Sequence, residues 1–367
     1  MERADVVIVG GGAVGTAAAR ALAGRGRAVT LLERGPIGHA DGSSGGPTRI
    51  FRLSYDLPDY VRMARVALRA WRELEAEAGE DLMVTTAGID VGVGARVAAD
   101  ALAACGEAFA WLDADAVAER WPALRLAAGE TALVQEDGGV CLAERTVHAQ
   151  ARLARARGAD VREATAALAI DVVGDGVEVR TAGGTIRADV AVVAAGAWAG
   201  SLLASLGIHV PLTPTLEQVT YLRLAAPSPL PTVIDWNEDG SAAPYAVPDP
   251  TDPGAFKIAL HGAGPPVDPD RDPRDADDVR RARAVDHAAV RFAPHSVGGT
   301  DTCLYTRTPD EDFVLDRVGP IVVASPCSGH GFKFTPLLGD LVADLATEAA
   351  PAVPLERFRL DRRALRA

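Results

Sequence analysis

The N-terminal segment contains the pattern that most limits how this chain can fold. An apolar run at residues 5–9 predicts a buried strand, and an alanine-rich run ending near residue 23 predicts a helix. Residues 28–33 then predict a second strand, parallel to the first. Between the first strand and the helix lie Gly10, Gly12 and Gly15. This strand, glycine turn, helix and strand form the Rossmann fingerprint, which predicts a parallel sheet covered by helices.

The same turn indicates a ligand. Its glycines let a pyrophosphate approach the N-terminus of the helix, where free N–H groups and the helix dipole favour anions. Glu33 ends the second strand, where its carboxylate can accept hydrogen bonds from ribose hydroxyls and its charge disfavours a 2′-phosphate. The alternative is a glycine-rich turn without a ligand. The pattern predicts a dinucleotide site, but by itself it does not distinguish NAD from FAD.

Length and charge narrow the class of protein. With 367 residues, the chain can form two domains around a substantial core. Its apolar fraction of 48% and charged fraction of 24% are typical of soluble globular proteins. Its net charge of −13 argues against nucleic acid or an anionic membrane as a partner. Net charge does not describe a buried site, so a local basic pocket is compatible with it.

The cysteines and the apolar runs favour a cytoplasmic protein. Cys105, Cys141, Cys303 and Cys327 are scattered without C-x-x-C spacing, so we expect neither a metal site nor a disulfide framework. The N-terminal apolar run leads straight into the glycine turn, unlike a signal peptide. The nearest approach to a membrane span, at residues 190–200, is far too short to cross a bilayer.

Periodicity predicts alternating helices and strands along the rest of the chain. Helices are expected at 59–79, 146–158 and 275–292, strands at 168–172, 177–181, 185–188 and 189–194, and a mixture of both at 80–140. Residues 206–300 are otherwise proline-rich and strand-like, and residues 320–349 predict a strand, a glycine-rich turn and a helix.

These elements predict an α/β (α+β) fold of two domains. Residues 1–80, 145–208 and 305–367 are expected to form a discontinuous Rossmann-like nucleotide-binding domain. Residues 81–144 and 209–304 are expected to form an inserted substrate domain that contains a large mixed β-sheet.

Five motifs, in this order, resemble one known family. They are the fingerprint with Glu33 and the segments 43–52 (SSGGPTRIFR), 256–261 (FKIALH), 303–310 (CLYTRTPD) and 327–334 (CSGHGFKF). Together they resemble the monomeric sarcosine oxidase and N-methyltryptophan oxidase family, within the D-amino-acid-oxidase-like FAD-dependent oxidoreductases. The resemblance runs from end to end and implies that FAD is the cofactor.

The resemblance implies roles for three cationic side chains near the substrate. Arg49 matches an arginine near the flavin ring, which would also assist covalent attachment of the flavin. Arg52 and Lys333 match the residues that hold the substrate carboxylate, and a guanidinium fork suits a carboxylate bidentately. By spacing alone, Arg49 and Arg52 fit an exposed cationic loop equally well.

A lysine and a histidine four residues apart suggest a second function. Lys257 and His261 share one face if their segment is a strand, so both can point into one cavity. The resemblance implies that Lys257 is the site of oxygen activation, because a fixed ammonium stabilises the anion that develops when oxygen is reduced. The alternatives are a solvated lysine on a surface strand and a structural histidine.

The fourth motif implies a covalent flavin. Cys303 matches the family cysteine whose sulfur is bonded to the flavin 8α carbon, and Tyr305 matches a tyrosine over the substrate. In a strand these two positions face the same way. Tyr245 matches a further pocket tyrosine. For Cys303 considered alone, a buried apolar thiol is the usual alternative.

The remaining cofactor contacts also follow from the resemblance. In the fifth motif, glycines allow backbone N–H groups to approach the flavin, and the following helix directs its positive end there. The full set of implied FAD contacts comprises Gly10, Gly12, Ala13, Val14, Gly15, Glu33, Arg34, Ser43, Ser44, Thr48, Arg49, Gly196, Trp198, Cys303, Gly329, Gly331, Phe332 and Lys333.

Two positions depart from the pattern of the sarcosine-type members. Trp236 falls where those members have a methionine, and Gly45 falls where they have a histidine. Both positions belong to the substrate pocket in the resemblance. The departures therefore leave the chemistry intact and predict a substrate other than sarcosine.

The expected function is FAD-dependent oxidation of a secondary amine that bears a carboxylate, an N-methyl or cyclic amino acid, to an imine with release of hydrogen peroxide. Its partners would be the amino acid and oxygen, and the family relation implies a monomer. One alternative is a flavin dehydrogenase or biosynthetic tailoring oxidase of a cyclic amino or imino acid that uses another acceptor. The other is a non-catalytic FAD-binding protein, which would have no use for Arg52, Lys257, Cys303 and Lys333 together.

Overall fold

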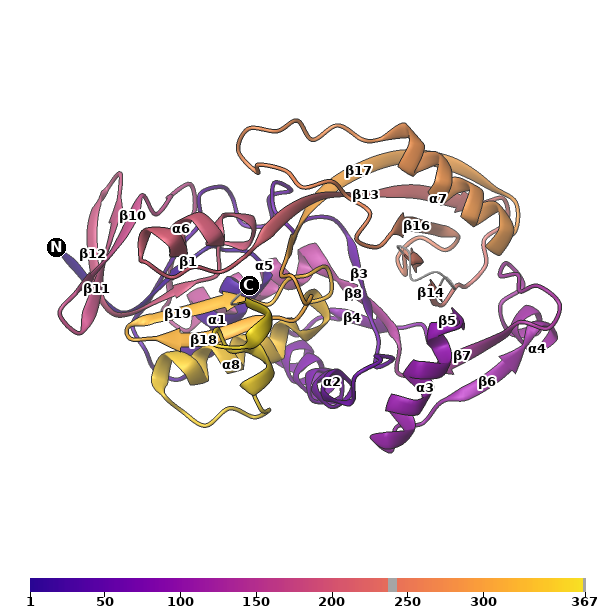
Figure 1. The fold of residues 1–367 in the computed structure, drawn as a ribbon, viewed down its shortest axis with the longest axis horizontal. Helices are drawn as coiled ribbons and strands as arrows, with labels where there is room; N and C mark the ends of the chain where they lie inside the picture. Colours follow the sequence, from indigo (N-terminus) through magenta and orange to yellow (C-terminus); the bar gives the residue numbers. More distant parts are fainter. Residues whose placement is uncertain (237–242, 366–367) are drawn as a thin grey trace.

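The computed structural model describes residues 1–236 and 243–365, which form two large sheets and the helices around them (Figure 1). The helices are α1 Ala13–Gly24, α2 Pro58–Ala78, α3 Gly94–Ala104, α4 Ala114–Arg120, α5 Ala143–Ala156, α6 Ala199–Ser205, α7 Asp278–Arg291 and α8 Thr335–Thr347. Short 3-10 turns are η1 Gly196–Trp198, η2 Phe332–Phe334, η3 Glu356–Phe358 and η4 Arg363–Leu365. Within the described residues, no helix combines the length and the apolar character needed to cross a membrane.

The first sheet is built around the fingerprint strands. Its strands are β1 Glu2–Val9, β2 Val29–Leu32, β9 Asp160–Arg162, β10 Ala169–Val173, β11 Gly176–Thr181, β12 Gly184–Val193, β18 Val314–Val318 and β19 Ile321–Ser325. The path runs β10-β11-β12-β1-β2-β9, and β19 pairs with both β12 and β18. The parallel pairs β12–β1, β1–β2 and β12–β19 place the carboxyl ends of the central strands at one edge, where the glycine turn lies.

Strand β12 differs from the prediction, which divided this segment into two strands. It is continuous because β1 pairs along almost all of it. On its other side, the first half pairs with β11 in a hairpin, and the second half pairs with β19. Strand β18 was not expected, and it forms an antiparallel hairpin with β19.

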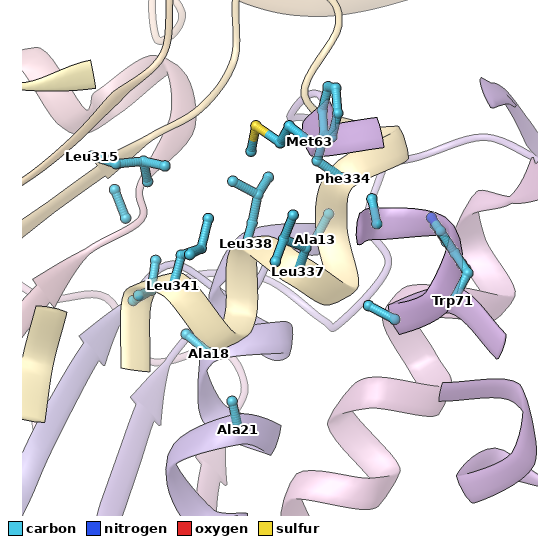
Figure 2. Close-up of a cluster of buried hydrophobic side chains, with 14 of the residues drawn as sticks. Ala13, Ala18, Ala21, Met63, Trp71, Leu315, Phe334, Leu337, Leu338 and Leu341 are labelled. Carbon is cyan, nitrogen blue, oxygen red and sulfur yellow. The ribbon is translucent and has the colours of Figure 1, made fainter. Parts of the chain in front are cut away.

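Small residues allow α1 to lie against α8 (Figure 2). A Cβ added to Gly339 of α8 would lie 2.6 Å from the carbonyl carbon of Ala17 in α1, so the two backbones nearly touch. Leu338 and Leu341 are fully buried beside this contact. Burial of each leucine side chain stabilises the fold by about 1.5–3 kcal/mol. The contact holds the N-terminal end of α1, and therefore the glycine turn, in a fixed place.

The second sheet is large and mixed, as the sequence predicted. Its order is β17-β13-β16-β15-β14-β5-β7-β6. The bounds are β5 Gly88–Gly92, β6 Ala110–Asp113, β7 Thr131–Gln135, β13 Thr213–Leu224, β14 Thr232–Trp236, β15 Pro244–Pro248, β16 Ala255–Leu260 and β17 His295–Arg307. Only the β14–β5 pair is parallel among the described strand pairs of this sheet. Helix α7 covers one face through Ala284 and Ala288, which pack in the cluster containing Phe256. The predicted α/β fold with a large mixed sheet is confirmed.

A small sheet lies between the two large ones (Figure 1). It consists of β3 Thr48–Phe51, β8 Gly139–Leu142 and β4 Met83–Thr85. Strand β3 contacts β15 of the second sheet and η2 of the segment that precedes α8. The turn before η2 is in turn tied to β17, because Ser328 N donates to Thr306 O at 2.8 Å. The segment with Arg49 and Arg52, strand β16 with Lys257, which pairs with β15, and the glycine-rich turn at residues 327–331 are therefore brought close together.

Candidate active site

A cavity of about 1010 Å³ opens where these segments meet. It extends from the N-terminus of α1 past the loop before β3 to the inner faces of β16 and β17 and the turn before α8. The site residues expected from the sequence that line it are Ala13, Val14, Ser43, Ser44, Gly45, Arg49, Arg52, Trp236, Tyr245, Lys257, His261, Cys303, Tyr305, Gly329, Gly331, Phe332 and Lys333. Residues from four of the five sequence motifs and the start of the fingerprint helix thus face one space.

The glycine turn at one end of the cavity has no room for side chains. A Cβ on Gly15 would lie 1.8 Å from Gly10 O, and Gly10 itself adopts φ +106°. Ser44 Oγ accepts a hydrogen bond from Ala13 N at 3.0 Å in the first turn of α1. The first turn carries no acidic residue. The closely packed turn backbone and the N-terminus of α1 together suit a pyrophosphate.

Glu33 lies beside the same turn. It is 5% exposed, and its two oxygens accept hydrogen bonds from Gly11 N at 2.6 Å and Gly35 N at 2.9 Å. His39 Nε2 lies 3.2 Å from Glu33 Oε1. The carboxylate is thus fixed at the end of β2, where a ribose bound along the turn would meet it.

Eight of the implied cofactor residues are not among those that line the cavity, namely Gly10, Gly12, Gly15, Glu33, Arg34, Thr48, Gly196 and Trp198. Of these, Arg34 and Trp198 form a separate cluster. The Arg34 guanidinium lies 3.9 Å from the centre of the Trp198 ring. Both side chains also bind Asp270, Arg34 at 3.0 Å and Trp198 Nε1 at 2.9 Å. Gly196, in the same 3-10 turn as Trp198, has φ +51°. Asp270 holds this cluster together independently of any ligand.

Arg49 braces the loop before β3. Its guanidinium donates to Ser43 O at 2.8 Å and to Gly45 O at 2.6 Å. A Cβ on Gly45 would lie 2.8 Å from Ala40 Cα, so the loop backbone is close here and a larger residue would require the loop to move. Because its donors are taken up by backbone carbonyls, Arg49 supplies a fixed positive charge to the cavity.

Lys257 is a buried cation on β16. It is 5% exposed, and its Nζ donates to Thr48 O at 2.6 Å. Burial and, next, the charge of Arg49 lower the pKa of Lys257 to about 7. Thr48 therefore enters the site through its carbonyl, and the ammonium is held in one position by the neighbouring strand β3.

His261 lies just after β16, on the same side as Lys257. Burial lowers its pKa to about 4, so the imidazole is neutral at pH 7. Its ring centre lies 6.4 Å from that of Tyr245 and 5.6 Å from that of Tyr305. Burial also raises the pKa of both tyrosines, that of Tyr245 to about 12. These three rings form an uncharged wall of the cavity.

Cys303 and Tyr305 face the cavity from β17, as alternate positions of a strand allow. Burial raises the pKa of the Cys303 thiol, while the charges of Arg49 and Lys257 act in the opposite direction. A Cβ on Gly329 would lie 2.3 Å from Tyr305 Cε2. Glycine at 329, with φ +77°, therefore makes room for the tyrosine ring.

Arg52 and Lys333 converge through a residue that the sequence reasoning did not identify, Tyr55. The Arg52 guanidinium lies 4.2 Å from the centre of the Tyr55 ring, and Lys333 Nζ donates to Tyr55 Oη at 3.0 Å. Lys333 also donates to His330 O at 2.8 Å, and it is 5% exposed. Burial and the charge of Arg52 hold its pKa well below the usual range.

Asp90 is a further residue that the sequence reasoning missed. It is 2% exposed, and its Oδ1 accepts a hydrogen bond from Trp236 Nε1 at 2.9 Å. Its signal in the sequence is a single carboxylate inside the apolar segment 88–92 (GIDVG). The signal for Tyr55 is its place three residues after Arg52, just beyond the end of the motif at residues 43–52.

The fit of this cavity to a dinucleotide can be tested at Gly15. Replacing Gly15 by valine is expected to weaken dinucleotide binding roughly fivefold to hundredfold, because overpacking against Gly10 O costs about 1–3 kcal/mol. FAD content and the dissociation constant of the reconstituted protein measure the effect. Gly299→Ala is the matched control, since a Cβ there meets nothing within 4 Å. Full FAD affinity in Gly15→Val would show that the turn does not hold the pyrophosphate.

Comparisons with known proteins agree with this geometry. Residues 5–345 match the family model described as FAD dependent oxidoreductase. The chain is 33% identical to a monomeric sarcosine oxidase of Streptomyces avermitilis, over 96% of each chain, and 31% identical to a peroxisomal sarcosine oxidase of Mus musculus, over 98% and 96%. Its fold is similar to that of NikD, described as an unusual amino acid oxidase essential for nikkomycin biosynthesis, with a TM-score of 0.89, 28% identity and 98% of each chain covered.

Proposed function

The chain belongs to the family of FAD-dependent oxidoreductases, and we propose that it oxidises a secondary amine bearing a carboxylate to an imine, with release of hydrogen peroxide. The observation that carries the substrate class is the pair of cations Arg52 and Lys333, which face the cavity together. Among the described residues, neither forms an ion pair with a carboxylate. Lys333 is 5% exposed, and burial holds its pKa well below the usual range, so a substrate carboxylate would offset the cost of its charge and complete the site.

FAD would lie between the glycine turn and Cys303. Glu33 would hold its ribose, the first turn of α1 its pyrophosphate, and the segment around Gly331 its ring system, with Cys303 as the covalent attachment. When bound, FAD would supply the redox chemistry, accepting the hydrogen and two electrons of the C–H bond next to the substrate nitrogen and passing the electrons to oxygen. We assign residues 1–80, 145–208 and 305–367 to the FAD-binding domain, which also contributes Arg52 and Lys333 to the substrate pocket. Residues 81–144 and 209–304 are assigned to the substrate domain, which also contributes Cys303 to the cofactor site.

The charges around the substrate favour its reactive form. Arg52 and Lys333 bind the carboxylate, while Lys257 places a further positive charge in the same cavity. Positive charges near a bound amine disfavour its protonated form, so the site selects the neutral amine, which has the electron pair that imine formation needs. No described side chain is then required as a general base.

Lys257 serves the oxygen half of the reaction in this proposal. Its ammonium is held by Thr48 O and excluded from bulk water. The ammonium is therefore already in position when negative charge develops on oxygen, and little solvent weakens the attraction between the two charges. Arg49 and Tyr305 flank the flavin position, and His261 and Tyr245 supply neutral walls. The enzyme would work as a monomer on a small amino acid and oxygen.

A second candidate function is a biosynthetic tailoring oxidase of a cyclic amino or imino acid. The fold similarity to NikD favours it. Both functions share the carboxylate site and differ in substrate and in electron acceptor. Peroxide release under air, matched to substrate consumption, supports the first function. Turnover of a cyclic amino or imino acid that needs another electron acceptor supports the second.

We expect a ring-bearing or larger amino acid to exceed sarcosine in kcat/KM by about tenfold or more, since one or two methylenes of apolar contact are worth roughly 1–3 kcal/mol. The reason is Trp236, a flat indole at the cavity wall. Sarcosine, N-methyltryptophan, pipecolate and proline are compared by flavin bleaching and steady-state rates. N-methylbenzylamine, which lacks a carboxylate, is the control. Sarcosine as the best substrate would contradict the role of Trp236, and rapid oxidation of the control would contradict the carboxylate site.

A further inference from the structure

A buried carboxylate lies directly behind the substrate wall. Asp90 is on β5, which pairs in parallel with β14, and the register places Asp90 opposite Ile234 and Gly92 opposite Trp236. Positions two apart share a face of the sheet, so Asp90 and Trp236 are diagonal neighbours. The 2.9 Å hydrogen bond from Trp236 Nε1 to Asp90 Oδ1 therefore fixes the indole at its polar edge.

Two glycines clear the space that the tryptophan needs. A Cβ on Gly92, which has φ +87°, would lie 2.1 Å from Trp236 O, so only glycine lets the two strands approach here. A Cβ on Gly94 would lie 2.7 Å from Trp236 Cγ, so the indole rests against the bare backbone at the start of α3. Because the ring is held at its N–H and against this backbone, its plane has one orientation.

The fixed indole also borders the carboxylate site. The Arg52 guanidinium lies 5.5 Å from the centre of the Trp236 ring and 4.2 Å from that of Tyr55, so it sits between two aromatic side chains. Burial raises the pKa of Asp90, and the charge of Arg52 acts against that rise. Beyond the indole, the cavity continues along small and apolar residues of α3, which are Gly94, Val97 and Ala98.

We infer that Asp90 is a positioning residue that sets substrate preference, because it holds the Trp236 indole as a rigid flat wall for an aryl or cyclic substituent of a carboxylate ligand. The inference rests on the proposed function only for the identity of the substrate. Asp90 does not touch the ligand. A flat wall that cannot rotate gives a planar substituent full contact at no cost in side-chain freedom, whereas a small ligand gains little from it.

The test measures preference on the holoenzyme by ligand binding. Benzoate and acetate are titrated separately, and the ratio of their dissociation constants is read from the change in flavin absorbance. This ratio is unaffected by protein concentration and FAD content. We expect the wild-type protein to favour benzoate by about tenfold or more, and Asp90→Leu to lose most of that preference, because a protein hydrogen bond is worth up to about a tenfold change in an equilibrium.

Three further variants separate positioning from general stability. Asp90→Asn keeps an oxygen that can accept from Trp236 Nε1, so it should retain the preference. Trp236→Phe removes the donor and should lose it, and the double variant with Asp90→Leu should lose no more than Trp236→Phe alone. Gly94→Ala displaces the indole without altering Asp90, so it should also lose the preference for benzoate. If Asp90→Leu fails to fold, Gly94→Ala replaces it as the variant in which the indole is no longer held in place.

The outcomes of the two proposals are distinct. A wild-type protein that binds acetate as well as benzoate, or an Asp90→Leu protein that keeps the full preference, would overturn the positioning role. So would a loss in Asp90→Asn as large as that in Asp90→Leu. If none of the amino acids reduces the flavin while the benzoate preference depends on Asp90, the amine oxidase proposal fails and the role of Asp90 stands.

Discussion

Replacing Lys257 by methionine is expected to slow reoxidation of the reduced enzyme by about a hundredfold or more, the usual effect of removing one preorganised charge directed at a developing anion. Methionine keeps approximately the length and apolar stem of the side chain. It loses only the ammonium that binds Thr48 O. Anaerobic reduction by the amino acid should suffer much less, because the substrate carboxylate is assigned to Arg52 and Lys333.

Stopped-flow kinetics measures the two half-reactions separately. The protein is first reduced by the substrate without oxygen and then mixed with oxygenated buffer. Lys333→Met is the matched control, since it removes another buried ammonium from the same cavity and should weaken substrate binding rather than the reaction with oxygen. Equal losses of Lys257→Met in both half-reactions would refute the assignment.

The pH dependence of the oxygen reaction provides a second measurement on the same variant. Lys257 carries its charge below its pKa of about 7 and loses it above, so the wild-type rate should fall as the pH rises through this value. An anionic reduced flavin nearby would raise the pKa and move the fall to higher pH. In Lys257→Met the fall should disappear, and a profile unchanged from the wild type would assign it to another group.

Replacing Cys303 by serine is expected to abolish covalent attachment of the flavin completely. The wild-type protein should carry one FAD adduct in its intact mass, and the yellow colour should stay with acid-precipitated protein. Cys303 faces the cavity. Burial is the largest effect and raises the pKa of its thiol, and the nearby charges of Arg49 and Lys257 oppose that rise. A serine hydroxyl is a far weaker nucleophile and retains nearly the same size.

Cys327→Ser is the control for this experiment. Cys327 lines the same cavity but lies in the turn before α8, and burial raises its pKa to about 11 without a nearby cationic side chain among the main causes. Its removal should leave the adduct in place. A wild-type mass without FAD, or an adduct that survives in Cys303→Ser, would disprove the attachment at Cys303.

The sequence was most informative where the chemistry depends on neighbours along the chain. The spacing of Gly10, Gly12 and Gly15 predicts the turn at the start of α1, because its tightest contact, Gly15 against Gly10 O, spans only a few residues. The alternation of Cys303 and Tyr305 predicts that both face one cavity, because a strand repeats every two residues. Dividing β12 into two strands was wrong, because its length is decided by three partner strands.

The sequence by itself determined the glycine turn, the class of fold and, through its motifs, the family. Only the tertiary structure decided which side chains meet, because these contacts join residues far apart in the chain. Trp236 meets Asp90 across the β5–β14 pairing, and Lys333 meets Arg52 through Tyr55. The lowered pKa of Lys257 is also a tertiary property, since burial and the charge of Arg49 arise only when the strands come together.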